Sequence, residues 1–212
     1  MLTHYKKNEL GLTLIEMMIA MVLGLFLTAV IITVFSTNVR SNVENMKMIR
    51  LNQELRGAMT FMVDELKRTG YSADSSNPAF MESFVHVNTS CILYSYDYNG
   101  DGTKGSDERF GFQLDTSVDQ IKWASDATDS CSFGEPITDA NMAEITTLDF
   151  DITGSINTDG SSFGSTAFTT TTDGTVSVYD VTITLTGKTD LPGTDPRRTL
   201  IETIRIRNED AK

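Results

Sequence analysis

The sequence predicts an α+β fold in which one long N-terminal helix packs on a mainly antiparallel β-sheet. Three observations support this fold class. The run Met17–Phe35 carries no charge, apolar residues recur at helical spacing from Met48 to Leu66, and short runs with alternating apolar residues follow Gly70. A helical part followed by a strand-rich part is typical of α+β domains, because helix and sheet then cover each other's apolar faces.

The uncharged run Met17–Phe35 is long enough to cross a bilayer. As a helix it would measure about 28 Å, close to the thickness of the hydrocarbon layer. It is longer than the apolar core of a secretory signal peptide, and no small-residue cleavage site follows it. A plain membrane anchor fits the length but leaves Glu16 unexplained, because a carboxylate in hydrocarbon costs free energy. Snorkelling of Glu16 to the lipid headgroups is the alternative explanation.

The residues around this carboxylate carry a family resemblance. The sequence Gly11-Leu12-Thr13-Leu14-Ile15-Glu16, which follows Lys6 and Lys7 and precedes the apolar run, resembles the class III signal of type IV prepilins and pseudopilins. The resemblance implies that a prepilin peptidase cuts between Gly11 and Leu12, that the new amine is methylated, and that Glu16 is retained for assembly. Leu12 stands where the family usually has Phe.

The predicted domain organisation follows from this signal. Residues 1–11 are expected to be a leader peptide that is removed, and residues 12–35 a transmembrane and filament-core helix. Residues 36–70 are expected to continue this helix in amphipathic form. Residues 71–212 are then a periplasmic, β-rich globular domain.

Two apolar stripes are predicted on the helix beyond the membrane. One consists of Met48, Leu51, Leu55, Met59, Met62 and Leu66, and the other of Val39, Val43 and Met46. At about 100° per residue they lie on nearly opposite sides. This favours the protein's own sheet as partner of the first stripe and other subunits as partners of the second. A loosely patterned linker is the alternative. No proline interrupts the helix before Thr69, and Gly70 is a natural stop.

The chain after Gly70 is predicted to form strands. The candidates are Phe84–Val87, Cys91–Tyr96, Phe110–Leu114, Gln120–Trp123, Ile145–Ile152, Val176–Thr186 and Thr199–Arg207. A change in the phase of alternation near Tyr179–Asp180 predicts a β-bulge. The segment Gly154–Gly174, rich in Thr, Ser, Gly and Asp, is expected to be a flexible excursion.

A second resemblance narrows the family. The segments Leu55–Tyr71, Met17–Leu27, Ile92–Gly102 and Thr199–Asn208 resemble PilW-type minor pilins. This implies a pilin fold and a minor pilin, a structural subunit that primes assembly at the tip of a type IV pilus. The implied location is the inner membrane, with a periplasmic domain, and then the cell-surface pilus. The implied partners are prepilin peptidase, inner-membrane lipid, the assembly machinery, and minor and major pilins through their N-terminal helices.

Two other functions remain open at this point. One is a pseudopilin of a type II secretion system, and the other is a membrane-tethered periplasmic binding domain that never assembles. An enzyme is not expected, because the sequence contains none of the common catalytic motifs, and His86 is the only histidine after the leader. Direct binding of nucleic acid is not expected either, because the net charge is −12 and a basic footprint is missing.

Cys91 and Cys131 are the only two cysteines of the chain. An even pair in an exported domain predicts one disulfide, with two free buried thiols as the alternative.

The last motif is acidic. Asp97-Tyr98-Asn99-Gly100-Asp101-Gly102, followed after five residues by Glu108, matches the calcium-loop pattern D-x-[DN]-x-[DN]-G-x₅-E. Calcium prefers six to eight oxygen ligands, which alternate residues of a tight loop can supply. The expected ligands are the side chains of Asp97, Asn99, Asp101 and Glu108, the carbonyl of Thr103, and a water at Gly105. The flanking residues read as strands, so a hairpin loop with solvated acidic residues is the alternative.

Overall fold

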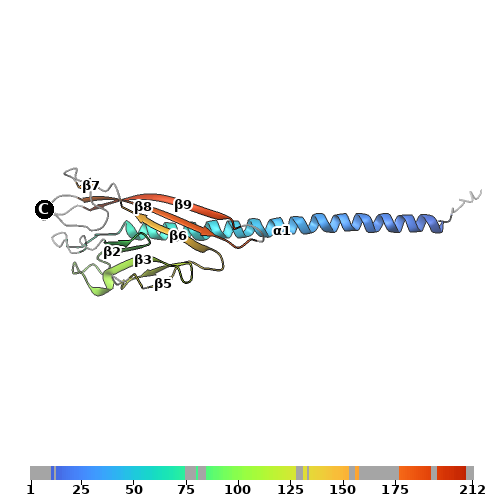
Figure 1. Cartoon of the computed structure of the whole chain (residues 1–212). Helices are drawn as coiled ribbons and strands as arrows, with labels where there is room; N and C mark the ends of the chain where they lie inside the picture. Colours follow the sequence, from blue (N-terminus) through green and yellow to red (C-terminus); the bar gives the residue numbers. More distant parts are fainter. Residues whose placement is uncertain are drawn as a thin grey trace, which may run out of the picture. The chain divides into compact units, whose positions relative to one another are not determined.

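The structure is a computed structural model, and it describes residues 11, 13–74, 80, 85–127, 131, 132, 134–152, 156, 157, 177–191 and 195–208. The chain divides into two compact units, residues 1–46 and 47–212. The helix α1, Leu14–Leu66, begins in the first unit and ends in the second. Figure 1 shows this helix and the strands that follow it. The leader residues 1–10 and Leu12, which belong to the predicted processing site, lie outside the described residues.

The C-terminal part of α1 buries the predicted stripe. Leu51, Leu55, Met62 and Leu66 are fully buried and Met59 is 3 % exposed, whereas Met48 at the start of the stripe is only half-buried. These residues face one side because they are spaced by three or four. The stripe predicted from the sequence is therefore confirmed as the buried face of the helix.

The helix ends at Leu66, a few residues before Gly70, where the sequence predicts its end. After Leu66 the backbone tightens, and the amides of Arg68 and Thr69 donate to carbonyls three residues earlier at 3.1 and 3.2 Å. Gly70 then takes a positive φ of 79°, which glycine adopts without steric cost, and its amide donates to the carbonyl of Ser95 at 2.8 Å. The expected stop at Gly70 thus attaches the helix end to a strand.

The first sheet is built from consecutive antiparallel strands. Its order is β1-β2-β3-β4-β5. The strands are β1 (Val85–Asn88), β2 (Cys91–Ser95), β3 (Arg109–Asp115), β4 (Gln120–Ala124) and β5 (Glu135–Pro136). The loop between β2 and β3 contains the acidic motif and ends in the 3₁₀ helix η2, Ser106–Glu108.

The second sheet is centred on β8. Its strands are β6 (Glu144–Asp151), β7 (Ile156–Asn157), β8 (Ser177–Lys188) and β9 (Arg197–Asn208). On one side β8 pairs antiparallel with β6 and, near its start, with β7, while on the other side it pairs with β9 along its whole length. All strand pairs of both sheets are antiparallel, as predicted.

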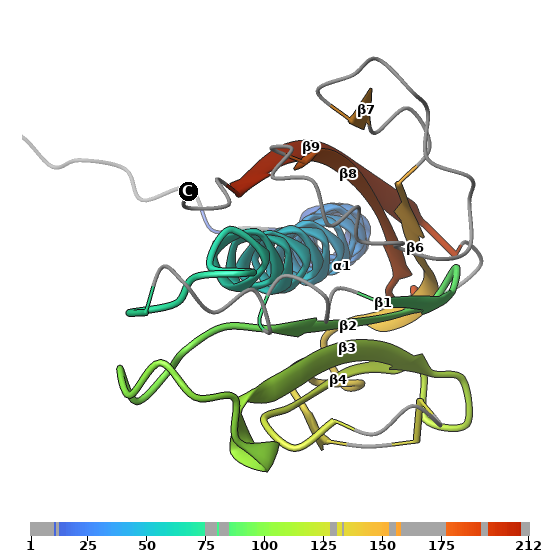
Figure 2. The ribbon, with the colours of Figure 1, turned by 90° about the vertical axis from the view of Figure 1, so that its left-hand side faces the viewer.

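The two sheets and the end of α1 share one hydrophobic core. Buried apolar side chains from the helix, from β2, β3 and β4, and from β6, β8 and β9 form a single cluster. In Figure 2, where the helix is seen along its axis, β6, β8 and β9 curve around one side of α1 and β2 and β3 lie on another side. The α+β prediction of a helix covered by antiparallel sheet is confirmed.

Several details of the strand prediction differ from the structure. All seven predicted strands are present, but β5 and β7 were not predicted, since each is a two-residue strand without alternation. The bulge expected near Tyr179–Asp180 is wrong, because β8 pairs with β9 residue by residue from Ser177 to Lys188. On its other edge β8 pairs with β7 at Val178 and with β6 from Thr182 onward. The phase of alternation changes between these two positions, where one neighbouring strand replaces the other. Of the predicted excursion Gly154–Gly174, only β7 lies within the described residues.

Candidate functional site: the apolar helix, the disulfide and the acidic loop

The N-terminal half of α1 exposes a continuous apolar surface. Its large apolar side chains from Leu14 to Phe35 are 46 to 79 % exposed. The hydroxyls of Thr28 and Thr33 donate to the carbonyls of Gly24 and Ala29, so these two polar side chains are satisfied by the helix itself. α1 is the one helix of the described part that is long and apolar enough to cross a membrane. Such a surface requires lipid or other apolar helices around it.

Glu16 lies in the first turn of this helix and is exposed. Its backbone amide donates to the Thr13 carbonyl at 3.1 Å, next to the Thr13 hydroxyl at 3.4 Å, so Thr13 caps the helix just after the expected cleavage point. A carboxylate in the first turn is stabilised by the helix dipole. Gly11, on the other side of that point, is also exposed.

The second predicted stripe also lies on the helix surface. Val39, Val43 and Met46 are 45, 50 and 54 % exposed. On the same stretch Arg40 and Glu44 form an ion pair at 3.0 Å. The stripe is thus an apolar strip on an otherwise polar surface.

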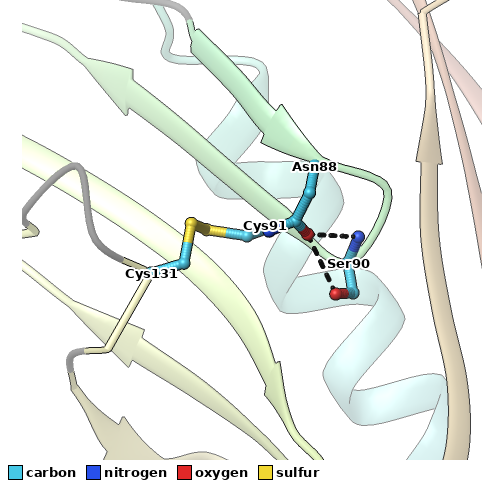
Figure 3. The surroundings of a disulfide bond; sticks show 4 residues. All are labelled: Asn88, Ser90, Cys91 and Cys131. Carbon is cyan, nitrogen blue, oxygen red and sulfur yellow. Dashed lines mark hydrogen bonds between the residues drawn. A yellow bond between two sulfur atoms is a disulfide. The ribbon is translucent and has the colours of Figure 1, made fainter.

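A disulfide joins Cys91 of β2 to Cys131, which follows β4 (Figure 3). Cys91 is 1 % exposed, and the sequence separation of the two cysteines is 40 residues. Beside it, the side-chain oxygen of Asn88 accepts bonds from the amide and the hydroxyl of Ser90 at 2.9 and 3.0 Å and shapes the β1–β2 turn (Figure 3). The structure therefore contains the pairing expected from the sequence, and no free cysteine remains.

The acidic loop between β2 and β3 brings three of its expected ligand residues together. Carboxylate oxygens of Asp97, Asp101 and Glu108 lie within 4.8 Å of one another. The side chain of Asn99 lies beside them, since its amide donates to Asp101 Oδ2 at 3.0 Å. Asp97 and Glu108 are buried, with 3 and 0 % exposure, whereas Asp101 is exposed. Thr103 and Gly105, the other two expected calcium ligands, are not part of this carboxylate cluster.

Backbone amides hold the two buried carboxylates in place. Asp97 accepts amides of Ala73, Gly100 and Gly102 at 2.7 to 2.9 Å, and Glu108 accepts those of Tyr98, Asn99 and Gly105 at 2.8 to 3.3 Å. These bonds, the one from Ala73 first, lower the pKa of Asp97 below its ordinary value.

Two glycines allow the tight turn of this loop. Gly100 and Gly102 have φ values of 77° and 70°, which favour glycine. A Cβ at position 102 would lie 2.6 Å from the Cβ of Asp74, so the loop packs tightly on the segment that follows α1. The flanking elements are strands, as the sequence indicated, and not the helices of an EF-hand.

Sequence reasoning missed a buried carboxylate at the end of α1. Glu65 is 6 % exposed and accepts hydrogen bonds from the hydroxyls of Tyr94 and Tyr96 at 3.3 and 3.2 Å. Arg68 lies 3.2 Å from its other oxygen, and the indole of Trp123 donates to Tyr94 at 2.9 Å. Burial raises the pKa of Tyr94 well above its ordinary range. The sequence feature that could have indicated this site is a charged residue at position 65, directly beside Leu66 of the buried stripe.

Comparison with known families identifies the chain. Residues 44–206 match the family described as prepilin peptidase-dependent protein B, and residues 6–32 match the prokaryotic N-terminal methylation motif. No curated protein and no solved structure shows a significant match. Both families are pilin-like and neither is a family of enzymes. Because the first match covers most of the chain, and the second lies on the Gly11–Glu16 signal and the apolar helix, this chain belongs to the prepilin peptidase-dependent protein B family of type IV pilin-like proteins.

Proposed function

We propose that this protein is a minor pilin, a low-abundance structural subunit that primes assembly at the tip of a type IV pilus. The observation that carries the proposal is the exposed apolar half of α1 directly after a prepilin-type signal. A helix of this kind is stable in a membrane before assembly and among other apolar helices after it. The unit from Lys47 onward, which includes the end of α1, is then located in the periplasm first and on the cell surface later.

The processing step has a definite product. Cutting between Gly11 and Leu12 removes the leader and leaves a methylated amine on Leu12, while Thr13 still caps the helix. Gly11→Val should block the cut and keep the protein in the inner membrane. The matched control is Gly24→Val, which changes an exposed glycine with open space around it inside the apolar run. Mass spectrometry of purified pili should find a mature chain that starts at Leu12, and intact residues 1–11 in filaments would contradict the proposal.

Glu16 is proposed to act in assembly. Among packed helices, where water is scarce, a carboxylate and a cationic amine offset each other's desolvation cost. Glu16 is therefore expected to pair with the N-terminal amine of an adjacent pilin, or the amine of Leu12 with a neighbour's carboxylate. Glu16→Val should insert into the membrane normally but enter filaments poorly. Glu44→Gln, which removes the charge of a partly exposed carboxylate further along α1, is the control. Normal incorporation of Glu16→Val would favour snorkelling instead.

The exposed stripe of Val39, Val43 and Met46 is proposed as a second contact with neighbouring subunits. These side chains are about half exposed, and covering them with another helix would lower the free energy because apolar surface is removed from water. Val43→Asp should reduce incorporation, whereas Glu44→Gln beside it should not.

Two related functions are separated from this proposal by simple observations. A pseudopilin of a type II secretion system would be needed for secretion and would be missing from sheared pili. A membrane-tethered periplasmic binding domain would never leave the inner membrane. Recovery of the protein in purified pili is the result expected here.

We also propose that the acidic loop binds calcium. The support is the full match to the calcium-loop pattern together with the convergence of Asp97, Asp101 and Glu108 within 4.8 Å. Calcium should then raise the melting temperature of the protein, because a ligand of the folded state stabilises it. Asp101→Ala should abolish the rise, while Asp107→Ala, an acidic change at a variable position of the pattern, should retain it. Equal melting temperatures in millimolar calcium and in excess chelator would favour a simple hairpin loop.

A further inference from the structure

A surface cleft lies where the end of α1 meets the acidic loop. Its volume is about 420 Å³. It is lined by Lys67, Arg68, Tyr71, Tyr96, Asp97 and Tyr98. A volume of this size is within the range of small-molecule sites in proteins. Neither the pilin families nor the assembly mechanism gives this cleft a role.

Main-chain bonds hold the two walls of the cleft together. The amide of Asp97 donates to the carbonyl of Tyr71 at 2.8 Å, and the amide of Gly70 donates to the carbonyl of Ser95 at 2.8 Å. The carboxylate of Asp97 adds a bond from the amide of Ala73 at 2.9 Å. Because these bonds are independent of the tyrosine side chains, the cleft is preorganised, which lowers the entropy lost on binding.

The aromatic rings of the cleft differ sharply in exposure. Tyr71 and Tyr98 are 60 and 71 % exposed, whereas Tyr96 is 6 % exposed. The rings of Tyr96 and Tyr98 lie 6.4 Å apart in an edge-to-face arrangement. The exposed rings of Tyr71 and Tyr98 provide flat apolar faces with hydroxyl groups at their edges, which suits a ligand ring with an apolar face and polar edges.

The accessible charge of the cleft is positive, in a chain whose net charge is −12. Lys67 is exposed, and the guanidinium of Arg68 lies 5.8 Å from the ring centre of Tyr96 and 3.2 Å from Glu65. A guanidinium has five N–H donors, so Arg68 keeps donors for a further acceptor. The carboxylate of Asp97, in contrast, is buried and already accepts hydrogen bonds from three backbone amides. The side-chain charge offered to a ligand is therefore cationic.

We propose that this cleft binds a saccharide that carries a carboxylate, such as a uronic acid residue. The apolar face of the sugar ring would lie on Tyr71 or Tyr98, and the carboxylate would be bound by Lys67 and Arg68. The cleft is open to solvent, so it takes one ring of a longer glycan as readily as a free sugar. This inference does not depend on the position of the protein in a filament.

The test compares two sugars that differ only in the carboxylate. Full-length protein in detergent micelles is titrated with methyl glucuronide and with methyl glucoside, and binding is followed by NMR. Acetate serves as the carboxylate without the ring. The glucuronide should bind roughly tenfold more tightly than the glucoside, since a charge-assisted hydrogen bond contributes at least that much. Acetate should bind more weakly than the glucuronide, because it lacks the ring.

Variants assign the binding to the cleft. Lys67→Gln should remove most of the preference for the glucuronide. Tyr98→Ala should weaken the binding of both sugars, and it keeps the hydrogen bond from the backbone amide of residue 98 to Glu108. Arg56→Gln, which removes another exposed basic side chain of α1, should change nothing. Equal affinity for both sugars, equal affinity for acetate and glucuronide, or binding unaffected by Lys67→Gln and Tyr98→Ala would each overturn the proposal.

Discussion

Gly187 of β8 lies directly against Leu55 of α1. A Cβ at position 187 would be 2.9 Å from Cδ2 of Leu55 and 3.4 Å from Cδ1 of Leu51, and both leucines are fully buried. The helix thus approaches the second sheet as closely as it does because this position has no side chain. Gly187→Val should destabilise the domain by about 1–3 kcal/mol through overpacking, as measured by denaturant unfolding. Wild-type stability of this variant would show that the leucines rearrange freely.

A second glycine provides the opposite prediction. Gly57 lies on the exposed side of α1, and a Cβ there would meet nothing within 4 Å. Gly57→Ala should therefore stabilise the protein by about 0.5–1 kcal/mol, because alanine loses less backbone entropy in a helix. A gain in the midpoint of denaturant unfolding, without a change in slope, is the expected result.

The disulfide should contribute strongly to stability. With a sequence separation of 40 residues between Cys91 and Cys131, the loop-entropy model gives about 3–4 kcal/mol. Reduction of the wild type should lower the melting temperature to that of a Cys91→Ser/Cys131→Ser variant, which should itself be insensitive to reductant. An unchanged melting temperature after complete reduction would contradict this expectation.

Glu65 should be needed for its hydrogen bonds rather than for its charge alone. Glu65→Ala would leave the buried hydroxyls of Tyr94 and Tyr96 without their acceptor, at a cost of about 1–3 kcal/mol or more. Glu65→Gln retains an acceptor oxygen and should therefore lose less stability than Glu65→Ala. If both variants lost the same stability, the ion pair with Arg68 would be the dominant interaction.

Acid should destabilise the acidic loop. The lowered pKa of Asp97 means that folding favours its ionised form. Its contribution is therefore present above the ordinary aspartate value of about 3.9 and is lost as the pH falls through the lower folded value. The melting temperature should therefore fall on acidification below about pH 4. The fall should be less steep in Asp97→Asn, which lacks this carboxylate, than in the control Asp64→Asn, which retains it. Parallel pH profiles for the two variants would speak against this role.

Local patterns of the sequence were enough to predict much of the fold. The buried stripe of α1 follows from helical periodicity, and Gly70 ends the helix region because of its backbone freedom. The approach of Asp97, Asp101 and Glu108 was predicted because a tight loop forces alternate residues to one point. The disulfide followed from an even pair of cysteines.

Contacts between distant segments could not be predicted in this way. Glu65 can be buried because Tyr94 of β2 and Tyr96, which directly follows β2, supply its donors, and nothing near Glu65 in the sequence indicates them. The bond from Ala73 to Asp97, and with it the cleft, depends on how the loop packs after α1. The strands β5 and β7 were missed because two residues are too few to show alternation.

The close fit of Leu55 over Gly187 has a mechanical consequence. A pulling force on α1 enters the domain near Lys47, whose ammonium donates to the carbonyl of Asp190 at 2.7 Å. To slide along its axis, the helix would have to lift Leu55 out of the space above Gly187 and bring another side chain there, one turn or about 5.4 Å away. The buried contacts along the helix would then break together rather than one after another. The fit at Gly187 therefore fixes the position of the helix along the sheet and resists sliding of one past the other.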